Sequence, residues 1–336
     1  MNQTQPDPRF DPTWRDDQFE LIALHLNLHL PADTPRNRRI WVQSAWERSE
    51  SLFGESYQNS TPRRVTAIVK PSDKGKYYTL RNEHGEVQEH NSPLLDVIFP
   101  PKAWMTDSAQ ERCMTWMAAK EARGKVLVGG LGLAIYPQFA LIMGKALESI
   151  TIVESSPDVI AIVGDSWFEP LRGTRAIQCQ LVQETLENYL QQSTEQFDTI
   201  YLDTWEDADA RFLPHVNYLI QLALTRCAPD GQIHAWSYAM MVDTFVRDAR
   251  MYVDQAFDLS EFNLDPALQA FADWREQQAA SELTPETIDR VAREIALTTV
   301  MPLADYDREQ CFTPYAASIH ESRLNWALAR KAAVEE

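Results

Sequence analysis

The chain has 336 residues, 44% of them hydrophobic and 24% charged, which is the composition of a globular protein with ample length for a buried core. Its 49 acidic and 31 basic residues give a net charge of -18. This charge disfavours sequence-independent binding along a nucleic-acid backbone. We therefore expect a small-molecule substrate, and a homo-oligomer stays open.

Cysteines and the N-terminus bear on compartment and metal content. The four cysteines lie far apart, with neither a CxxC pair nor the Cys/His spacing of a zinc site, which predicts reduced thiols and no metal. The first dozen residues are polar and acidic, so we expect a flexible lead on a cytoplasmic protein. Residues 126–144 carry no charge, but their glycines and Pro137 fit a buried α/β core better than a membrane span.

The N-terminal third has the pattern of β-structure. In LHLNLHL the alternation puts His25 and His29 on the polar face of a strand rather than in a metal site. Two aromatic-flanked arms around the turn EHGE predict a β-hairpin over Tyr77–Glu89. Residues 1–105 are therefore predicted to form a β-rich extension.

A helix is predicted to lead from this extension into the centre of the chain. Ser108, followed three residues later by Glu111, forms a capping-box signature, and Gly124 is a typical helix end. Beyond it, short β-branched runs alternate with helix-length segments, which favours βαβ units and a largely parallel sheet. The predicted strands are Lys125–Gly129, Ser149–Glu154, Ala176–Val182, Asp198–Asp203 and Gly231–Tyr238.

The most informative stretch is GKVLVGGLGLA, residues 124–134, where an apolar strand runs into a glycine-rich turn and a helix-forming segment. Gly129, Gly130 and Gly132 allow positive φ and close approach of the backbone to a ligand. The helix that begins there points free N–H groups at whatever lies above the strand. This stretch predicts a nucleotide-like cofactor.

Acidic residues follow the next strands. Glu154 ends the strand ITIV, 24 residues after Gly130 and near the offset of about 20 residues at which such folds place an acid on a ribose. Glu184 follows the third strand and Asp203 ends the fourth. Because the carboxyl ends of the strands form the ligand crevice of a doubly wound sheet, we expect these residues to converge.

The spacing also limits which nucleotide is bound. A dinucleotide fingerprint needs a third small residue where this chain has Ile135, while Ala134 lies one place early. A P-loop needs GK[ST] after the glycines, and Lys145 is too distant. NAD is therefore disfavoured, and a phosphate-cradling P-loop is excluded.

Three segments carry a resemblance: VGGLGLA is similar to a glycine-rich first motif, FDTIYLD to a fourth strand, and TRCAPDGQIHAW to a turn and fifth strand. Over residues 106–238 the pattern resembles the class I S-adenosylmethionine-dependent methyltransferases. Within that class it resembles the spermidine-synthase-like branch. The resemblance implies S-adenosylmethionine as cofactor and an α/β, Rossmann-like methyltransferase fold with a doubly wound, mostly parallel sheet over residues 106–245. The implied cofactor-binding residues are Gly129, Gly130, Gly132, Ala134, Glu154, Glu184 and Asp203.

Two alternatives to methyl transfer remain. The first motif of the aminopropyltransferases in this branch is similar to GGGDGG. Gly132 stands where they have the Asp that contributes to amine binding. Asp203 and Glu206 keep part of their second pattern, D-S-S/T-D. The other alternative is a non-catalytic binding or assembly protein that retains the fold.

The residues after the fourth strand carry the predicted chemistry. Displacement at a sulfonium needs a positioned, deprotonated nucleophile, so Asp203 is the candidate base for an amine or hydroxyl acceptor, with Glu206 as a second catalytic candidate. Trp205 would face a cationic group, with Asp207 adding negative potential on the substrate side. In the alternative, Asp203 only caps the next helix and Trp205 packs. His234 is expected to be structural, with a substrate contact as the alternative.

The C-terminal part is predicted to be helical. Thr284 and Thr313 each precede a proline, the usual pairing of an N-cap with a first-turn proline. Residues 246–336 are therefore expected to form a helical extension that could serve as a lid or an oligomer interface.

Overall fold

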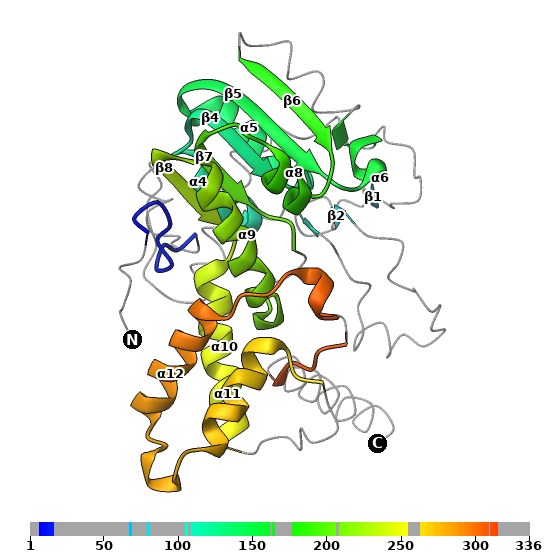
Figure 1. Ribbon diagram of the computed structural model, residues 1–336. Helices are drawn as coiled ribbons and strands as arrows, with labels where there is room; N and C mark the ends of the chain where they lie inside the picture. The colour runs from blue at the N-terminus through cyan, green and yellow to red at the C-terminus, as the bar shows by residue number, and fades with distance from the viewer. Residues whose placement is uncertain are drawn as a thin grey trace, which may run out of the picture. The chain divides into compact units, whose positions relative to one another are not determined.

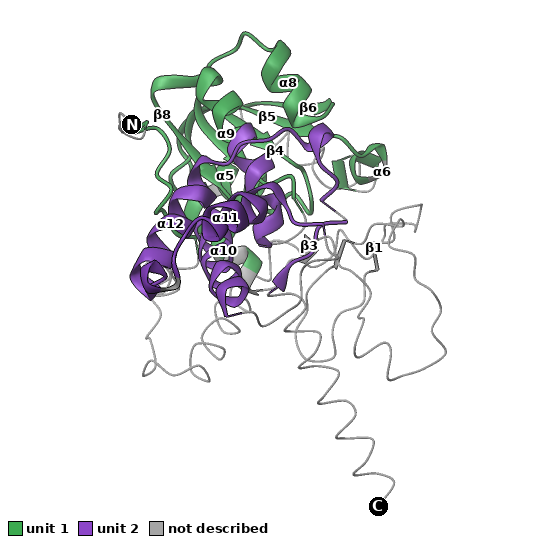
Figure 2. Cartoon of the chain, turned by 60° about the horizontal axis from the view of Figure 1, so that its bottom comes forward, with its two compact units in different colours: residues 1–84, 103–206, 219–237 green, residues 85–102, 207–218, 238–336 purple. Residues whose placement is uncertain are grey.

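The computed structural model describes residues 7–16, 67–68, 79–80, 105–106, 109–161, 163–164, 177–205, 208–254, 263–308 and 310–314. The chain divides into two compact units (Figure 2). The first contains residues 1–84, 103–206 and 219–237, and the second contains residues 85–102, 207–218 and 238–336. Each helix in the described ranges is too short or too polar to cross a bilayer.

A five-stranded parallel sheet forms the centre of the first unit (Figure 1). Its strands are β4 (Arg123–Gly129), β5 (Lys145–Glu154), β6 (Gln178–Gln183), β7 (Phe197–Leu202) and β8 (Cys227–Ala235). The order is β6-β5-β4-β7-β8, and every neighbouring pair is parallel. The chain thus winds outward from β4 through β6 and then returns to the other side of β4. This confirms the predicted doubly wound, Rossmann-like sheet, whose reversal point lies between β4 and β7.

Helices cover both faces of the sheet. On one face, α4 (Ala109–Ala119) and α5 (Ile135–Met143) share a buried cluster with Val126 and Val128 of β4. Successive side chains of a strand point to opposite faces, so Gly129 faces the other way from Val128. A Cβ atom on Gly129 would overlap the side chain of Leu186 in α8 (Leu186–Gln192), which places α8 on the second face.

Three further helices connect or follow these strands in the chain. They are α6 (Pro157–Val159), the 3-10 helix η4 (Ala210–Phe212) and α9 (Leu213–Arg226). Ser156 caps α6 by accepting a hydrogen bond from the backbone N–H of Val159 at 3.3 Å. The alternation of strand and helix that the sequence predicts is therefore present from β4 to β8.

The packing of Gly129 gives a testable expectation. Replacement of Gly129 by alanine forces its Cβ into Leu186, and overpacking of a core typically costs about 1–3 kcal/mol. We expect Gly129→Ala to lower the free energy of unfolding by that amount in urea titrations. In a double-mutant cycle with Leu186→Ala the two effects should be strongly non-additive, because the second change removes the atoms that clash. Simple additivity would contradict this packing.

Two predicted boundaries are wrong. The helix expected to end at Gly124 ends at Ala119, and Gly124 lies inside β4 with a φ of 59°. A Cβ on Gly124 would overlap the carboxylate of Asp198, so the glycine serves a close approach between strands rather than a helix end. The last predicted strand ends at Ala235, and Tyr238 begins a helix instead.

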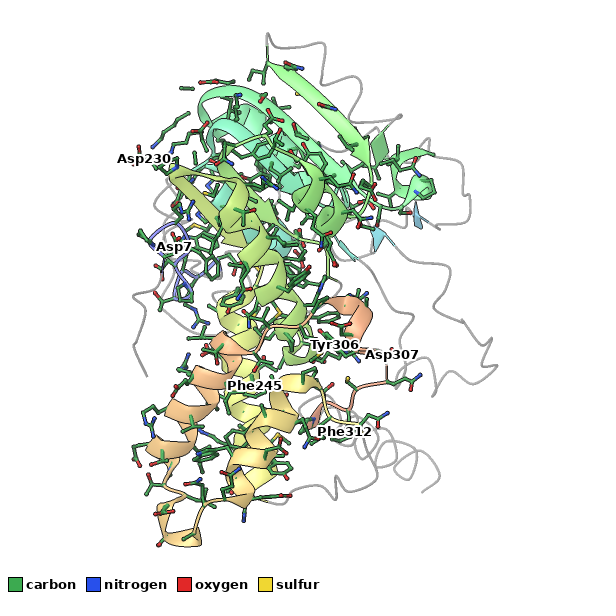
Figure 3. All side chains as sticks on the ribbon, in the orientation of Figure 1. Asp7, Asp230, Phe245, Tyr306, Asp307 and Phe312 are labelled. Carbon is green, nitrogen blue, oxygen red and sulfur yellow. The ribbon has the colours of Figure 1, made fainter. Side chains whose placement is uncertain are left out.

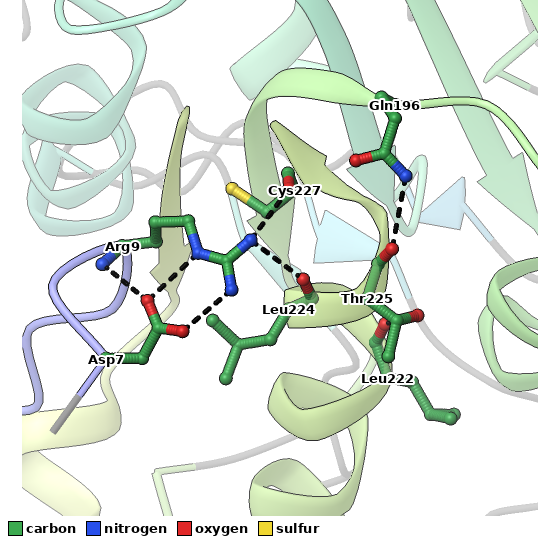
Figure 4. A network of polar contacts seen from close by, with 7 residues as sticks. All are labelled: Asp7, Arg9, Gln196, Leu222, Leu224, Thr225 and Cys227. Atoms are coloured by element: carbon green, nitrogen blue, oxygen red, sulfur yellow. Dashed lines mark hydrogen bonds and ion pairs between the residues drawn. The ribbon is translucent and has the colours of Figure 1, made fainter. Parts of the chain in front are cut away.

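The N-terminal segment is ordered against the sheet, which corrects the expectation of a flexible lead for its described part, residues 7–16. Phe10 forms a parallel bridge with Ile233 of β8, whose N–H donates to the carbonyl of Arg9 at 2.8 Å. The guanidinium of Arg9 binds the carboxylate of Asp7 and donates to the carbonyl of Cys227 at 2.8 Å (Figure 4). The pKa of Asp7 is lowered to about 2, chiefly by this side-chain hydrogen bond.

A small antiparallel sheet precedes α4 in the chain. The strands β1 (Ala67–Ile68) and β3 (Met105–Thr106) both pair with β2 (Thr79–Leu80). The turn of the predicted hairpin lies outside the described residues, as do His25 and His29.

The second unit is helical in its described part. Besides η4 and the start of α9, it contains α10 (Tyr238–Val253), α11 (Pro266–Glu276), α12 (Pro285–Thr298) and the 3-10 helices η5 (Ala280–Glu282) and η6 (Leu303–Asp305). The N-cap predicted at Thr284 is confirmed, because its side chain accepts a hydrogen bond from Thr287. Phe245 of α10, which is labelled in Figure 3, packs edge-on against Phe271 of α11. The helix predicted after Thr313 falls largely outside the described residues.

Candidate active site

The strand ends at the reversal point are joined by backbone hydrogen bonds. The N–H of Asp203, just after β7, donates to the carbonyl of Gly129 at 3.0 Å. The N–H of Gly130 donates to the carbonyl of Val153 in β5 at 2.8 Å. The glycine turn therefore lies between the ends of β5 and β7, where a doubly wound sheet forms its ligand crevice.

Gly130 is required by this arrangement. Its φ is 91°, and a Cβ atom would overlap the backbone oxygen of Asp203. Gly132 also has a positive φ, 49°. Ala134 is fully buried and left-handed, with a φ of 54°, and it forms the N-cap of α5 without a side-chain hydrogen bond. Because no side chain caps α5 there, its first N–H groups suit a ligand at the turn.

Glu154 ties the end of β5 to the glycine turn. Its Oε2 accepts from the N–H of Leu131 at 2.9 Å, and its Oε1 accepts from the N–H of Ser156 at 2.8 Å. The side chain is only 7% exposed, and burial raises its pKa against the opposing effect of these N–H groups. The N–H groups of Gly132 and Ser155 also lower this pKa, so the carboxylate is held by the backbone on both sides of β5's end.

Glu184 lies beside Glu154 but acts locally. Its backbone N–H donates to the carbonyl of Glu154 at 3.1 Å. Its Oε1 accepts from the N–H of Thr185 at 2.9 Å and from the Asn188 side chain at 3.1 Å, at the start of α8. These two hydrogen bonds, the Thr185 bond first, lower its pKa. The backbones of the two glutamates are thus adjacent at the strand ends, while the side chain of Glu184 is hydrogen-bonded to the start of α8.

Asp203 has unusual electrostatics for a strand-end carboxylate. Burial, then the charge of Asp16 and more weakly that of Glu154, raises its pKa to about 7, while the Tyr201 hydroxyl opposes the shift. A carboxyl with a pKa near the working pH suits general acid–base chemistry. The following helix, η4, is capped by Asp209 instead, so the alternative role of Asp203 as its cap is wrong.

The remaining predicted site residues are either buried in the protein or lie outside the described ranges. Trp205 is only 5% exposed, so the structure places its ring among packed side chains. Glu206 and Asp207 are not among the described residues. His234 is buried, stacks on Trp14 with ring centroids 4.4 Å apart, and has its pKa lowered to about 4 by burial. We therefore assign His234 a structural role, as a neutral imidazole.

Four residues at this strand edge were not predicted from the sequence: Tyr136, Tyr201, Asp16 and Ser237. Tyr136 of α5 stacks on Tyr201 of β7 with ring centroids 4.0 Å apart. Asp16 accepts a hydrogen bond from the N–H of Ser237 at 2.7 Å. Alternation along β7 could have placed Tyr201 on the same face as Asp203. The position of Asp16 depends on pairing with a segment more than 200 residues away, which no local pattern records.

Comparison with known proteins gave no matching family model and no matching curated protein. Solved structures with partial likeness include spermidine synthase from Thermotoga maritima, at 16% identity and a TM-score of 0.28 over 49% of this chain and 50% of that one. Human methyltransferase-like protein 13 in complex with SAH matches at 14% identity and a TM-score of 0.27, over 39% of this chain and 66% of that one.

The Trypanosoma brucei PRMT1 enzyme-prozyme complex with AdoHcy matches at 22% identity and a TM-score of 0.26, over 36% of each chain. In all three cases the chain covers less than two thirds of the other protein. The structural neighbours thus include S-adenosylmethionine-dependent methyltransferases and spermidine synthases. TM-scores this low carry no inference about function, which follows from the residues of the site.

Proposed function

We propose that the chain is an S-adenosylmethionine-dependent methyltransferase that acts in the cytoplasm on a small acceptor bearing an amine or hydroxyl. The observation that carries this proposal is the buried carboxylate of Glu154, bound to the glycine turn at the reversal point of the sheet. Gly130 supports it, because the absent side chain lets the turn approach the end of β7. Asp203 lies beside both as the candidate base.

The residues present fit such a cofactor. Gly130 and Gly132 contribute no side chains to the turn, and the start of α5 offers backbone N–H groups. Glu154 is the acidic residue beside the turn that would bind the ribose hydroxyls, and Glu184 lies next along the edge for the adenine side. Bound S-adenosylmethionine supplies an electrophilic methyl group on a sulfonium.

The chain's own residues would then orient the acceptor and take its proton. Asp203 accepts the proton at a carboxylate oxygen, which its raised pKa of about 7 favours near neutral pH. Placement of the acceptor beside the methyl donor supplies much of the rate enhancement. Glu206, Trp205 and Asp207 remain proposed as the second catalytic carboxylate and the substrate side of the site.

An aminopropyltransferase is the alternative enzyme, since its amine substrate would suit the same carboxylates. Gly132 weighs against it, because this residue has no side chain to hold the amine. A binding or assembly protein with the same fold is the non-catalytic alternative. Calorimetric titration with S-adenosylmethionine, its decarboxylated form and S-adenosylhomocysteine separates the three. Preference for the decarboxylated form would favour aminopropyl transfer. Absence of binding of all three compounds would contradict both enzyme hypotheses.

The role of Glu154 predicts a difference between two equivalent substitutions. In Glu154→Gln an amide NH₂ replaces one of two buried oxygens that accept backbone N–H groups, so the turn loses a hydrogen bond to a charged group. Such bonds are worth about 1.5–3 kcal/mol, and we expect the affinity for S-adenosylmethionine to fall about 10–100-fold. The measurement is isothermal titration calorimetry.

The matched control is Glu195→Gln, which precedes β7 and so lies at the opposite end of the sheet from the candidate site. Its exposed carboxylate lies 3.9 Å from the ammonium of Lys125. We expect this variant to lose less than about 3-fold in affinity, since exposed polar contacts contribute little. Equal losses in the two variants would mean that Glu154 has no special part in cofactor binding.

A further inference from the structure

Asp16 of the N-terminal segment lies at the same strand edge as Asp203. Its side chain is only 4% exposed, and its Oδ2 accepts from the N–H of Ser237 at 2.7 Å. Ser237 follows β8, and the N–H of the preceding Trp236 donates to the carbonyl of Leu202 at 2.9 Å. Leu202 is the last residue of β7, directly before Asp203. The segment therefore delivers a second carboxylate to the candidate active site.

The two carboxyls act on each other. The charge of Asp16 is the largest electrostatic cause, after burial, of the raised pKa of Asp203. Like charges held close together in a buried place cannot both ionise without a large free-energy penalty. The other groups that act on this pair or on the adjoining Tyr201 are Glu154, Glu111 of α4 and Tyr136 of α5.

A buried hydroxyl at this place points independently to a ligand. Ser237 is fully buried in the left-handed conformation, with a φ of 54°, and its hydroxyl has no hydrogen-bond partner among the described residues. The hydroxyl of buried Tyr201 instead interacts with the carboxyl of Asp203 and lowers its pKa. Buried unsatisfied hydroxyls and strained backbone are both typical of binding sites.

We propose that Asp16 is a positioning residue for Asp203: in the ligand-free protein the two carboxyls share one proton up to about neutral pH, and entry of a cationic group expels that proton. The step balances, since one carboxylic acid becomes a carboxylate and its proton passes to the buffer. Asp16 thereby keeps Asp203 protonated until the site is filled. This inference rests on the proposed function, but its first test does not require the cofactor.

The first test is a titration of the ligand-free protein by NMR of ¹³C-labelled aspartate carboxyls, with the Asp203 signal assigned from Asp203→Asn. We expect Asp203 to titrate near pH 7 in the wild type and at least about one pH unit lower in Asp16→Asn. Asparagine keeps an oxygen that can accept from Ser237, so the segment should stay docked. An unchanged midpoint in Asp16→Asn would overturn the proposal.

Two further variants separate charge from structure. Asp11→Asn alters an exposed carboxylate of the same segment, which accepts from Thr13, and should leave the Asp203 midpoint unchanged. Asp16→Glu keeps the charge and should restore most of the raised midpoint. If Asp16→Asn does not fold, the Asp16 signal in Asp203→Asn gives the same coupling from the other side, because it is reciprocal. Absence of a shift there would contradict the proposal equally.

The second test measures protons exchanged on binding, by calorimetry at pH 7 in buffers of different ionisation enthalpy. Because Asp203 is about half protonated at pH 7, cationic S-adenosylmethionine should release up to about half a proton per site from the wild type, and neutral-sulfur S-adenosylhomocysteine much less. In Asp16→Asn the release should fall toward zero, because Asp203 is already ionised. Absence of S-adenosylmethionine binding would contradict the proposed function. Binding with equal proton release in both proteins would contradict only the role of Asp16.

Discussion

The Gly130→Ala variant is expected to lose affinity for S-adenosylmethionine by more than about 100-fold, equivalent to roughly 3 kcal/mol. Its Cβ would overlap the Asp203 carbonyl oxygen, so the turn and the end of β7 must move apart. The φ of 91° adds strain, since an L-residue other than glycine adopts such values only at a cost of about 1–3 kcal/mol. Both effects displace the atoms that would hold the cofactor.

A glycine at the opposite end of the same sheet gives the control. In Gly231→Ala the new Cβ would lie 2.7 Å from the Cys227 sulfur and 3.1 Å from the carbonyl oxygen of Phe197. Phe197 begins β7, so this overpacking lies away from the candidate site. We expect Gly231→Ala to lower stability while the affinity for S-adenosylmethionine stays within about 3-fold of the wild type. A similar loss of binding in both variants would show that sheet stability alone governs it.

The central sheet could be predicted from the sequence because its signals are local. Each signal lies within a single element: an apolar run of strand length, the glycine turn, or an acidic residue at a strand end. Glu154 is identified by its separation from Gly130 along the sequence. The structure confirms all five strands, with ends that move by a few residues. The N-cap at Thr284 was predictable for the same reason, since a cap and its helix are adjacent in the chain.

The rest of the site depends on contacts between distant segments. Nothing in the run WRDD distinguishes Asp16 from its neighbour, and its burial follows from docking of residues 7–16 on β8. The end of α4 at Ala119 was missed because Gly124, which resembles a helix end, is instead required by the nearby Asp198. The raised pKa of Asp203 also arises from tertiary burial and a partner brought from the N-terminal segment. Local propensity carries no record of such contacts.

Replacement of Asp203 by asparagine is expected to stabilise the protein at pH 8. The pKa of Asp203 rises from 3.8 in the unfolded chain to about 7 in the folded protein, so folding favours the protonated form. Its contribution to stability is complete below pH 4 and is lost as the pH rises through 7. Asparagine does not titrate, so the advantage of Asp203→Asn should grow between pH 4 and 7 to about 2 kcal/mol, after allowance for its partial exposure. Urea unfolding across this range provides the measurement.

Asp265 supplies a matched comparison in the second unit. It is buried, its pKa is likewise raised to about 7 by burial, and it caps α11 by accepting from Ala267 and Leu268. Asparagine is an equally good N-cap, so Asp265→Asn should show the same pH-dependent stabilisation with unchanged affinity for S-adenosylmethionine. Asp203→Asn should instead abolish the proton release on cofactor binding and lower methyl transfer, followed as S-adenosylhomocysteine formation with a panel of amines and alcohols, by about 100-fold or more.

Comparison of Asp203→Asn with Asp265→Asn distinguishes a carboxyl that has only a structural role from one that takes part in proton transfer. If Asp203→Asn were destabilising at every pH, its charged form would be stabilising in the native state and could not serve as a base poised near neutrality. If both variants gained stability and both kept the transfer activity, Asp203 would be removed as the base. A gain in stability at pH 8, combined with loss of transfer only at Asp203, is the result expected of a site that keeps a carboxyl partly protonated at the expense of the fold.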